Sequence, residues 1–155
     1  MRLPLLTLAL VVLALVGCGR FPGDGFDLAR CAADTRRRST IKLADYTAFQ
    51  WDRVHTFRPY ASDNVVAEET GTEVPFPGSD SERFCLLVFL LNGKVVMATE
   101  VERKVLDFAD VYRKGGYSQS EAVFTLAYRG AERWPYLQTS ASSPSEPAFD
   151  PPTTP

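Results

Sequence analysis

The residues able to act as nucleophiles, bases or metal ligands are few and widely spaced in this chain. Its 155 residues include one histidine, His55, and three cysteines, Cys18, Cys31 and Cys85. A single imidazole excludes a metal site built from several histidines, and the cysteine spacing does not resemble a zinc-binding pair. No serine lies in a sequence that resembles a nucleophile elbow. The sequence therefore predicts neither a metal nor a cofactor.

Carboxylates are the remaining candidates for catalysis. Two neighbouring pairs, Glu68-Glu69 and Asp107 with Asp110, could supply the acid and the base of a glycosidase-type hydrolysis. Neighbouring acidic residues are common on helix surfaces without catalytic roles, and Gly115-Gly116 lacks the lysine and the spacing of a phosphate-binding loop. We therefore expect that the protein is not an enzyme, with a hydrolase that uses these carboxylates as the alternative.

Cys18 stands at the end of a distinctive N-terminal segment. Arg2 precedes an apolar run, Leu3 to Val16, which as a helix rises about 21 Å and is too short for a hydrocarbon core of about 30 Å. The run ends in Leu15-Val16-Gly17-Cys18, which resembles the lipobox of bacterial lipoprotein precursors. The resemblance implies a signal peptide over residues 1–17, diacylglycerol on the Cys18 thiol and a further acyl chain such as palmitate on its amino group.

This resemblance also implies a location. Several acyl chains hold a protein on a membrane much more firmly than one chain does. Gly19 stands where an aspartate would indicate retention at the inner membrane. We therefore expect a lipoprotein of the bacterial outer membrane that faces the periplasm, tethered through residues 18–23. An uncleaved anchor and an ordinary signal peptide cut near Gly17 or Gly19 remain the alternatives.

The mature chain has the size and charge of one small domain. Removal of residues 1–17 takes Arg2 away, so 16 of the 17 basic residues remain against 19 acidic ones, and the formal charge changes from −2 to −3. This balance argues against nucleic acid as a partner. An exported chain meets an oxidising compartment, so we expect a disulfide between Cys31 and Cys85, with two buried free thiols as the alternative.

A β-hairpin is the clearest structural signal. Phe84 to Leu91 is apolar, Asn92-Gly93 suits a type I′ turn, and Lys94 to Val101 forms the returning strand. A two-residue turn fixes the register, which predicts pairs between Val88 and Met97, Leu86 and Thr99, and Phe84 and Val101. The face that carries Phe84, Leu86 and Val88 is expected to meet the core. The opposite face, with Cys85, Leu87 and Phe89, is expected to be covered in part.

The rest of the chain predicts an α+β class: one domain over residues 24–138, with an antiparallel sheet of four or five strands and one to three short helices. A helix capped by Asp24 should run to about Arg37, and residues 41–60 should form one or two strands broken near Asp45-Tyr46. A second helix, capped by Ser62 or Asp63, should end at Gly71, before a surface loop over residues 72–82. Residues 102–113 fit an amphipathic helix or an irregular edge segment. Ala122 to Arg129 is expected to form a strand. Residues 139–155, rich in proline and serine, should form an unfolded tail.

Two surfaces are candidates for binding. Trp51, Arg53, His55 and Phe57 should share one strand face, and the segments around Trp51-Asp52-Arg53-Val54 and Phe57-Arg58-Pro59-Tyr60 resemble parts of small bacterial envelope proteins, which implies no activity. Arg36-Arg37-Arg38 could contact anionic lipid head groups or form a solvated helix end. We expect a non-enzymatic role in binding or assembly, with an envelope protein or cell-wall component as partner. The alternatives are an envelope or cell-wall hydrolase, and a module that binds a soluble ligand or inhibitor through the loop.

Overall fold

The chain folds as an α+β domain, which confirms the predicted class. The structure, a computed structural model, describes residues 25–74, 81–131 and 133–139. It contains two antiparallel sheets, with strand orders β1-β6-β7 and β4-β3-β2-β5, in place of the single sheet that we expected. The elements are α1 (Leu28–Asp34), β1 (Thr40–Lys42), η1 (Leu43–Tyr46), β2 (Arg53–Phe57), α2 (Asp63–Thr70), β3 (Phe84–Leu91), β4 (Lys94–Glu102), η2 (Ala109–Val111), β5 (Tyr117–Ser118), β6 (Val123–Arg129) and β7 (Trp134–Thr139).

Several predicted segments lie outside the described residues. These are the signal peptide and the tether, the cap residue Asp24, part of the loop over residues 72–82, and the tail from residue 140 onward. Thr139, where we expected the tail to begin, is the last residue of β7 and pairs with Phe124. No helix within the described part of the chain is long and apolar enough to cross a membrane.

Local capping interactions explain where helices α1 and α2 begin and where α2 ends. Asp27 caps α1, because its Oδ1 accepts a hydrogen bond of 2.9 Å from the Arg30 backbone N–H, and the helix ends at Asp34 rather than near Arg37. Helix α2 agrees with the prediction. The Ser62 side chain accepts a hydrogen bond from the Val65 N–H, and Gly71 ends the helix in the left-handed conformation with φ of 71°.

A β-bulge shifts the register of the β3–β4 hairpin. Leu90 pairs with Val95 as expected, but Phe89 pairs with Met97, so Val96 is an extra residue on β4. Beyond the bulge every predicted pair is wrong by one residue. The observed pairs are Val88 with Ala98, Leu86 with Glu100 and Phe84 with Glu102.

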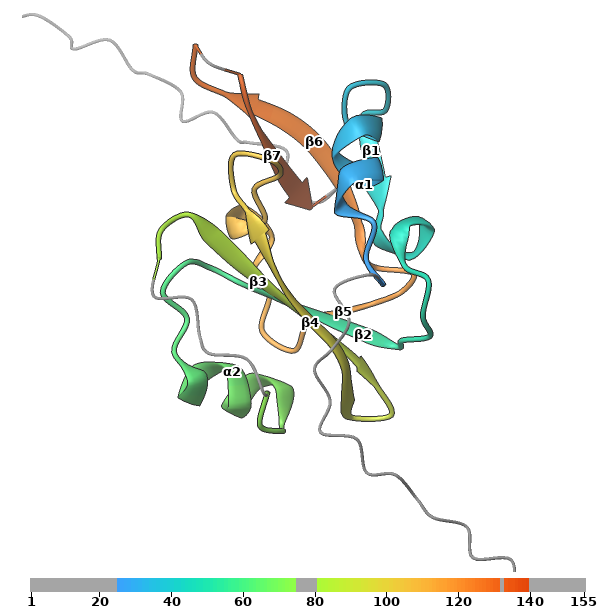
Figure 1. Cartoon of the computed structure of the whole chain (residues 1–155), viewed down its shortest axis with the longest axis vertical. Helices are drawn as coiled ribbons and strands as arrows, with labels where there is room; N and C mark the ends of the chain where they lie inside the picture. Colours follow the sequence, from blue (N-terminus) through green and yellow to red (C-terminus); the bar gives the residue numbers. More distant parts are fainter. Residues whose placement is uncertain (1–24, 75–80, 132, 140–155) are drawn as a thin grey trace, which may run out of the picture.

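The face of β3 that meets the main core also differs from the prediction. Cys85, Leu87 and Phe89 belong to the larger cluster of buried side chains, which lies between the two sheets and includes residues of α1. The opposite face, with Leu86, Val88 and Leu90, forms a smaller cluster with Phe57 and with Val66 of α2. The predicted core face was therefore wrong. Figure 1 shows the four-stranded sheet between α2 on one side and α1 with the three-stranded sheet on the other.

Residues 102–113 form an irregular edge segment, which was one of the two expected outcomes. The backbone of Asp107 forms a parallel bridge with β7: its N–H donates to Pro135 O over 3.1 Å, and its carbonyl accepts from the Leu137 N–H over 3.0 Å. These groups are no longer available for helical hydrogen bonds. Only η2 remains helical, although Phe108 is buried as the periodicity indicated.

Candidate functional site

The predicted aromatic binding surface is not exposed. Trp51, His55 and Phe57 are 3%, 2% and 1% exposed, so these side chains cannot contact a partner. Trp51 does not share the face of the others, since its ring packs on Phe89 in the main core at a centroid distance of 5.3 Å. Only Arg53 is exposed, and its Nη1 donates a hydrogen bond of 2.6 Å to Gly115 O. The prediction failed because α2 and the loop before β5 cover the strand.

His55 is a buried structural residue. Its ring stacks on Phe57 at 6.1 Å between centroids, and its Nδ1 has no hydrogen-bond partner among the described residues. Burial lowers the pKa of His55 below its ordinary value of 6.5, although Glu69 opposes this effect. His55 is therefore a neutral, enclosed imidazole, which does not suit a base that acts on an external substrate.

The four candidate carboxylates are not gathered at one site. Asp107 is buried and accepts hydrogen bonds of 3.1 and 2.9 Å from Arg103 Nε and Nη2. Asp110 pairs with Arg129, and Glu69 accepts a hydrogen bond from the Tyr112 hydroxyl. Asp107, Asp110 and Glu69 thus each have a partner that holds them in place, and none of the four carboxylates lines one of the three grooves described below.

The two described cysteines are free thiols inside the main core. The expected disulfide between Cys31 and Cys85 is therefore not formed in this structure. Burial raises the pKa of each thiol to about 12, so neither is a nucleophile near neutral pH. Among the described residues, no group of three or more His, Cys, Asp or Glu side chains could hold a metal ion.

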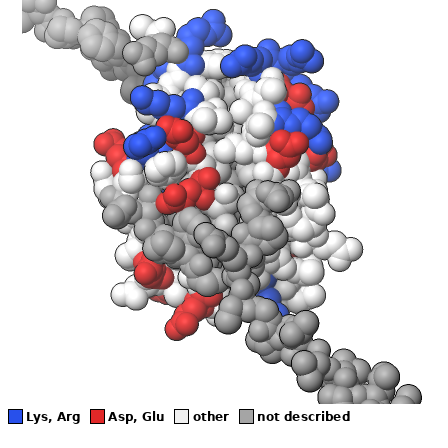
Figure 2. Space-filling model, viewed as in Figure 1, with Lys and Arg blue, Asp and Glu red and all other residues white. Residues whose placement is uncertain are grey.

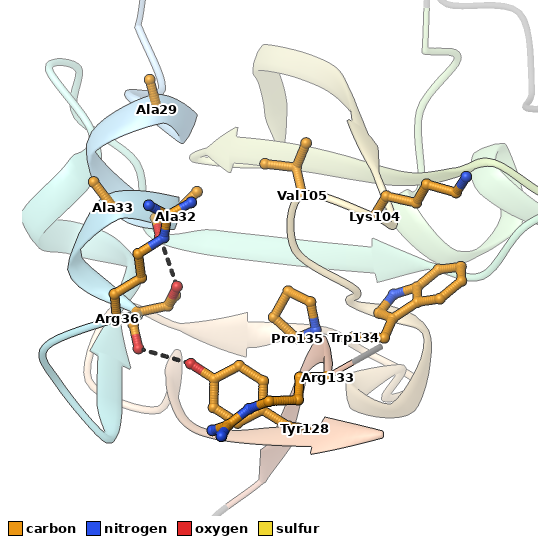
Figure 3. A pocket seen from close by; sticks show the side chains of 11 residues that line it. Ala29, Ala32, Ala33, Arg36, Lys104, Val105, Tyr128, Arg133, Trp134 and Pro135 are labelled. Carbon is orange, nitrogen blue, oxygen red and sulfur yellow. Dashed lines mark hydrogen bonds between the residues drawn. The ribbon is translucent and has the colours of Figure 1, made fainter. Parts of the chain in front are cut away.

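A groove of about 620 Å³ is the candidate site. It lies between α1, the segment that follows β4, and the β6–β7 hairpin, and Figure 3 shows side chains from all three around it. We call it the cationic groove. Its lining comprises Ala29, Ala32, Ala33, Thr35, Arg36, Lys104, Val105, Tyr128, Arg133, Trp134 and Pro135.

The charge of this groove is not neutralised within the described part of the chain. Arg36, Lys104 and Arg133 are exposed, and none forms an ion pair with a described carboxylate. Four other arginines pair with acidic side chains: Arg83, Arg103, Arg113 and Arg129. Figure 2 shows Lys and Arg gathered at the end of the molecule where α1 ends and the β6–β7 hairpin turns. The groove is thus a site of uncompensated positive charge.

The β6–β7 hairpin fixes the position of one cation. Arg133 has a φ of 52°, in the left-handed region that residues other than glycine adopt at a cost in free energy. Its guanidinium lies over the Tyr128 ring. The Tyr128 hydroxyl donates a hydrogen bond of 3.3 Å to Thr35 O at the end of α1. This bond ties the hairpin to the helix across the groove (Figure 3).

Two other grooves are less suited to binding a charged ligand. One of about 280 Å³ is lined by Glu82, Arg83, Glu102 and Arg103, whose charges pair with one another, and by Lys104 and Trp134, which also line the cationic groove. The other, of about 540 Å³, lies beside the start of α1 and mixes Asp27 and Asp45 with Arg30. Both of these grooves are lined by acidic and basic groups together, so neither has a lining of one sign of charge.

Sequence reasoning found only one part of the cationic groove. The Arg36-Arg37-Arg38 run indicates either a contact for lipid head groups or a solvated helix end, and Arg36 lines the site. The contributions of the β6–β7 hairpin were missed, because Trp134–Thr139 contains a proline and was not predicted as a strand. Comparisons with protein-family models, curated protein sequences and solved structures find no match to this chain.

Proposed function

We propose that this protein is a lipid-anchored lipoprotein of the bacterial envelope, in the outer membrane and facing the periplasm, with a non-enzymatic binding role. The cationic groove binds an anionic component of the envelope. The observation that carries this proposal is that three exposed cations without described carboxylate partners, Arg36, Lys104 and Arg133, line one groove of about 620 Å³. Ligand sites typically have volumes of about 300 to 1,000 Å³.

The anchor lies close in sequence to one wall of the groove, which is formed by α1. Six residues, 19–24, separate Cys18 from Gly25, so even a fully extended tether reaches less than about 25 Å. Ala29, the first groove residue, follows Gly25 closely on α1. Lipid on Cys18 therefore keeps the groove close to the membrane surface and to the anionic molecules found there.

Replacement of Cys18 tests the anchor. The Cys18→Ser chain should lose incorporation of radiolabelled fatty acid, and globomycin, an inhibitor of lipoprotein signal peptidase, should block maturation of the wild-type precursor. The variant should also fail to reach the outer-membrane fraction in its mature form. A variant that is trimmed to the same length and held on the membrane as firmly as the wild type would refute the anchor.

Site-specific crosslinking tests the groove in the full-length protein. A photoreactive residue replaces either Val105, which lines the groove, or Tyr60, which is 63% exposed, precedes α2 and does not line the groove. We expect an envelope component to be captured from position 105 and not from position 60.

Charge reversal supplies the matched control for this experiment. The groove variant carries Arg36→Glu, Lys104→Glu and Arg133→Glu. The control variant makes the same change of net charge at exposed lysines that do not line the groove, with Lys42→Glu, Lys94→Glu and Lys114→Glu. Capture from position 105 should be lost in the groove variant and kept in the control variant. Equal capture in both would show that the groove is not the binding site.

A further inference from the structure

We infer that the C-terminal segment, residues 140–155, docks into the cationic groove of its own chain. The segment carries two acidic side chains, Glu146 and Asp150. One of them contacts Arg36 and the other contacts Arg133, while the apolar residues between them lie on the wall of α1. The segment then competes with the envelope ligand, so this inference rests on the proposed function and adds regulation to it. Four features of the molecule support it.

The first feature is the placement of the cations. Figure 3 shows Arg36 and Arg133 at separate edges of the groove, with Lys104 directed away from both. Lys104 also lines the smaller groove together with Glu82 and Glu102. A single compact anion therefore does not suit the cationic groove. An extended chain with two spaced carboxylates suits Arg36 and Arg133 better, because each cation then has its own partner.

The second feature is the charge pattern of the C-terminal segment. It contains Glu146 and Asp150 but no lysine, arginine or histidine. Its proline content favours the polyproline II conformation, in which four residues rise about 12 Å and three residues make one turn. Two carboxylates four positions apart would then point to different sides of the chain. This pattern is complementary to two cations at separate edges.

The third feature is the match of apolar surfaces. Phe149 is the one large apolar side chain of the C-terminal segment, and it stands between the two acidic residues with Pro147 and Ala148. The groove has an apolar wall, made of Ala29, Ala32, Ala33, Val105 and Pro135. The short alanine side chains leave room for a ring against α1. Removal of these apolar surfaces from water would add to the affinity.

The fourth feature is the length of chain available. Pro135 lines the groove near the start of β7, and the strand ends at Thr139, about 13 Å further along. The seven residues from Thr139 to Glu146 span up to about 22 Å, which is enough to turn back and reach the groove. A connection this short gives the segment an effective concentration in the millimolar range. Individually weak contacts are therefore sufficient for docking.

Photocrosslinking within the purified full-length protein tests the inference. The photoreactive residue again replaces Val105, and mass spectrometry identifies the peptides joined to it. We expect crosslinks to residues 146–150. An equal mixture of isotope-labelled and unlabelled protein shows whether they form within one chain, because such crosslinks have no mixed masses. Crosslinks of mixed mass, or none to residues 146–150, would overturn the inference.

Neutral variants show whether the acidic side chains hold the segment. Glu146→Gln with Asp150→Asn should lower the crosslink yield up to about fivefold, since each exposed ion pair contributes about twofold to threefold. The matched control, Glu68→Gln with Glu73→Gln, removes the same charge at exposed positions outside the groove and should leave the yield unchanged. Equal yields from the two variants would contradict the inference.

Charge exchange separates loss of docking from loss of folding. Arg36→Glu with Arg133→Glu should abolish the crosslink, because like charges then face each other. The further changes Glu146→Lys and Asp150→Lys should restore it. The indole NMR signal of Trp51, which is buried in the main core, reports that each variant is folded. A folded variant with exchanged charges and no crosslink would refute the docking.

Capture in cells distinguishes this inference from the proposed function. Glu146→Gln with Asp150→Asn should increase capture of the envelope component from position 105, because the competing segment is weakened. If the purified protein gives no crosslink to residues 146–150 while capture in cells still depends on the groove cations, docking of the segment is refuted and the proposed function stands. If the crosslink forms within the chain and no envelope component is captured, the segment is the occupant and the proposed function is refuted.

Discussion

The guanidinium of Arg133 lies 4.8 Å from the centroid of the Tyr128 ring, at the turn of the β6–β7 hairpin. Both residues line the cationic groove, and the backbone of Arg133 has a φ of 52°. A cation is thus held over an aromatic ring at a position where glycine would fit without strain. This relationship links the stability of the hairpin to the charge of the groove.

Replacement of Arg133 should separate backbone strain from side-chain contact. Arg133→Gly removes a strain of about 1 kcal/mol and loses a cation–π contact worth about 0.5–1 kcal/mol, so stability should change little. Arg133→Ala keeps the strain and loses the contact. We expect the glycine variant to be more stable than the alanine variant by about 1 kcal/mol in urea unfolding, although both lose one groove cation. An alanine variant as stable as the glycine variant would contradict this account.

Gly116 should be much less tolerant of a side chain than its neighbour Gly115. Both have positive φ, of 65° and 81°. A Cβ at position 116 would lie 2.5 Å from Val54 O and 3.0 Å from the His55 ring, whereas one at position 115 meets nothing within 4 Å. Gly115→Ala should cost about 1 kcal/mol for the backbone conformation alone. Gly116→Ala should cost several times more, as measured by thermal and urea unfolding, and equal losses would show that the loop relaxes.

Asp107 should be the most costly of the four candidate carboxylates to remove. Asp107→Ala leaves the largely buried guanidinium of Arg103 without its partner, which should cost about 3–5 kcal/mol. The matched pair Arg129–Asp110 has side chains that are 58% and 43% exposed, so Asp110→Ala should cost less than about 1 kcal/mol. Chemical denaturation of both variants compares them, and similar losses would mean that burial of the first pair has no energetic consequence.

His55 should make the domain less stable in mild acid. Its folded-state pKa lies below 6.5, so the unfolded chain takes up a proton before the folded chain does as the pH falls. The stability from neutral His55 is complete above pH 6.5 and decreases as the pH falls below that value. Unfolding free energies of wild type and His55→Gln between pH 7 and pH 5 measure this contribution. The difference between the two should narrow in acid, and a constant difference would exclude the effect.

The thiols of Cys31 and Cys85 should resist alkylation in the folded protein. Burial raises the pKa of each from 9.0 to about 12, and both side chains are inaccessible. Iodoacetamide should react with them only after denaturation, while a surface thiol introduced by Lys114→Cys reacts at once, as mass spectrometry would show. Because the folded state holds these protons more tightly, stability should also decrease as the pH rises above 9.0. Rapid alkylation under native conditions would contradict the observed burial.

The features that the sequence predicted correctly depend on a few adjacent residues. Asn92 and Gly93 have φ values of 52° and 73°, as the type I′ turn requires, and Ser62 and Gly71 cap α2 at its two ends. The break between β1 and β2 and the strand from Val123 to Arg129 also follow from local composition and alternation. Such signals are readable because the hydrogen bonds or side-chain preferences behind them lie within one turn or one strand.

Contacts between distant segments decided the rest. Packing against α1 and the three-stranded sheet decided which face of β3 enters the main core, and a backbone bridge from Asp107 to β7 kept residues 102–113 from forming a helix. The cationic groove arises only where α1, the segment after β4 and the β6–β7 hairpin come together. Burial and backbone pairing of this kind depend on which surfaces face each other in three dimensions, and that information is not contained in any local stretch of sequence.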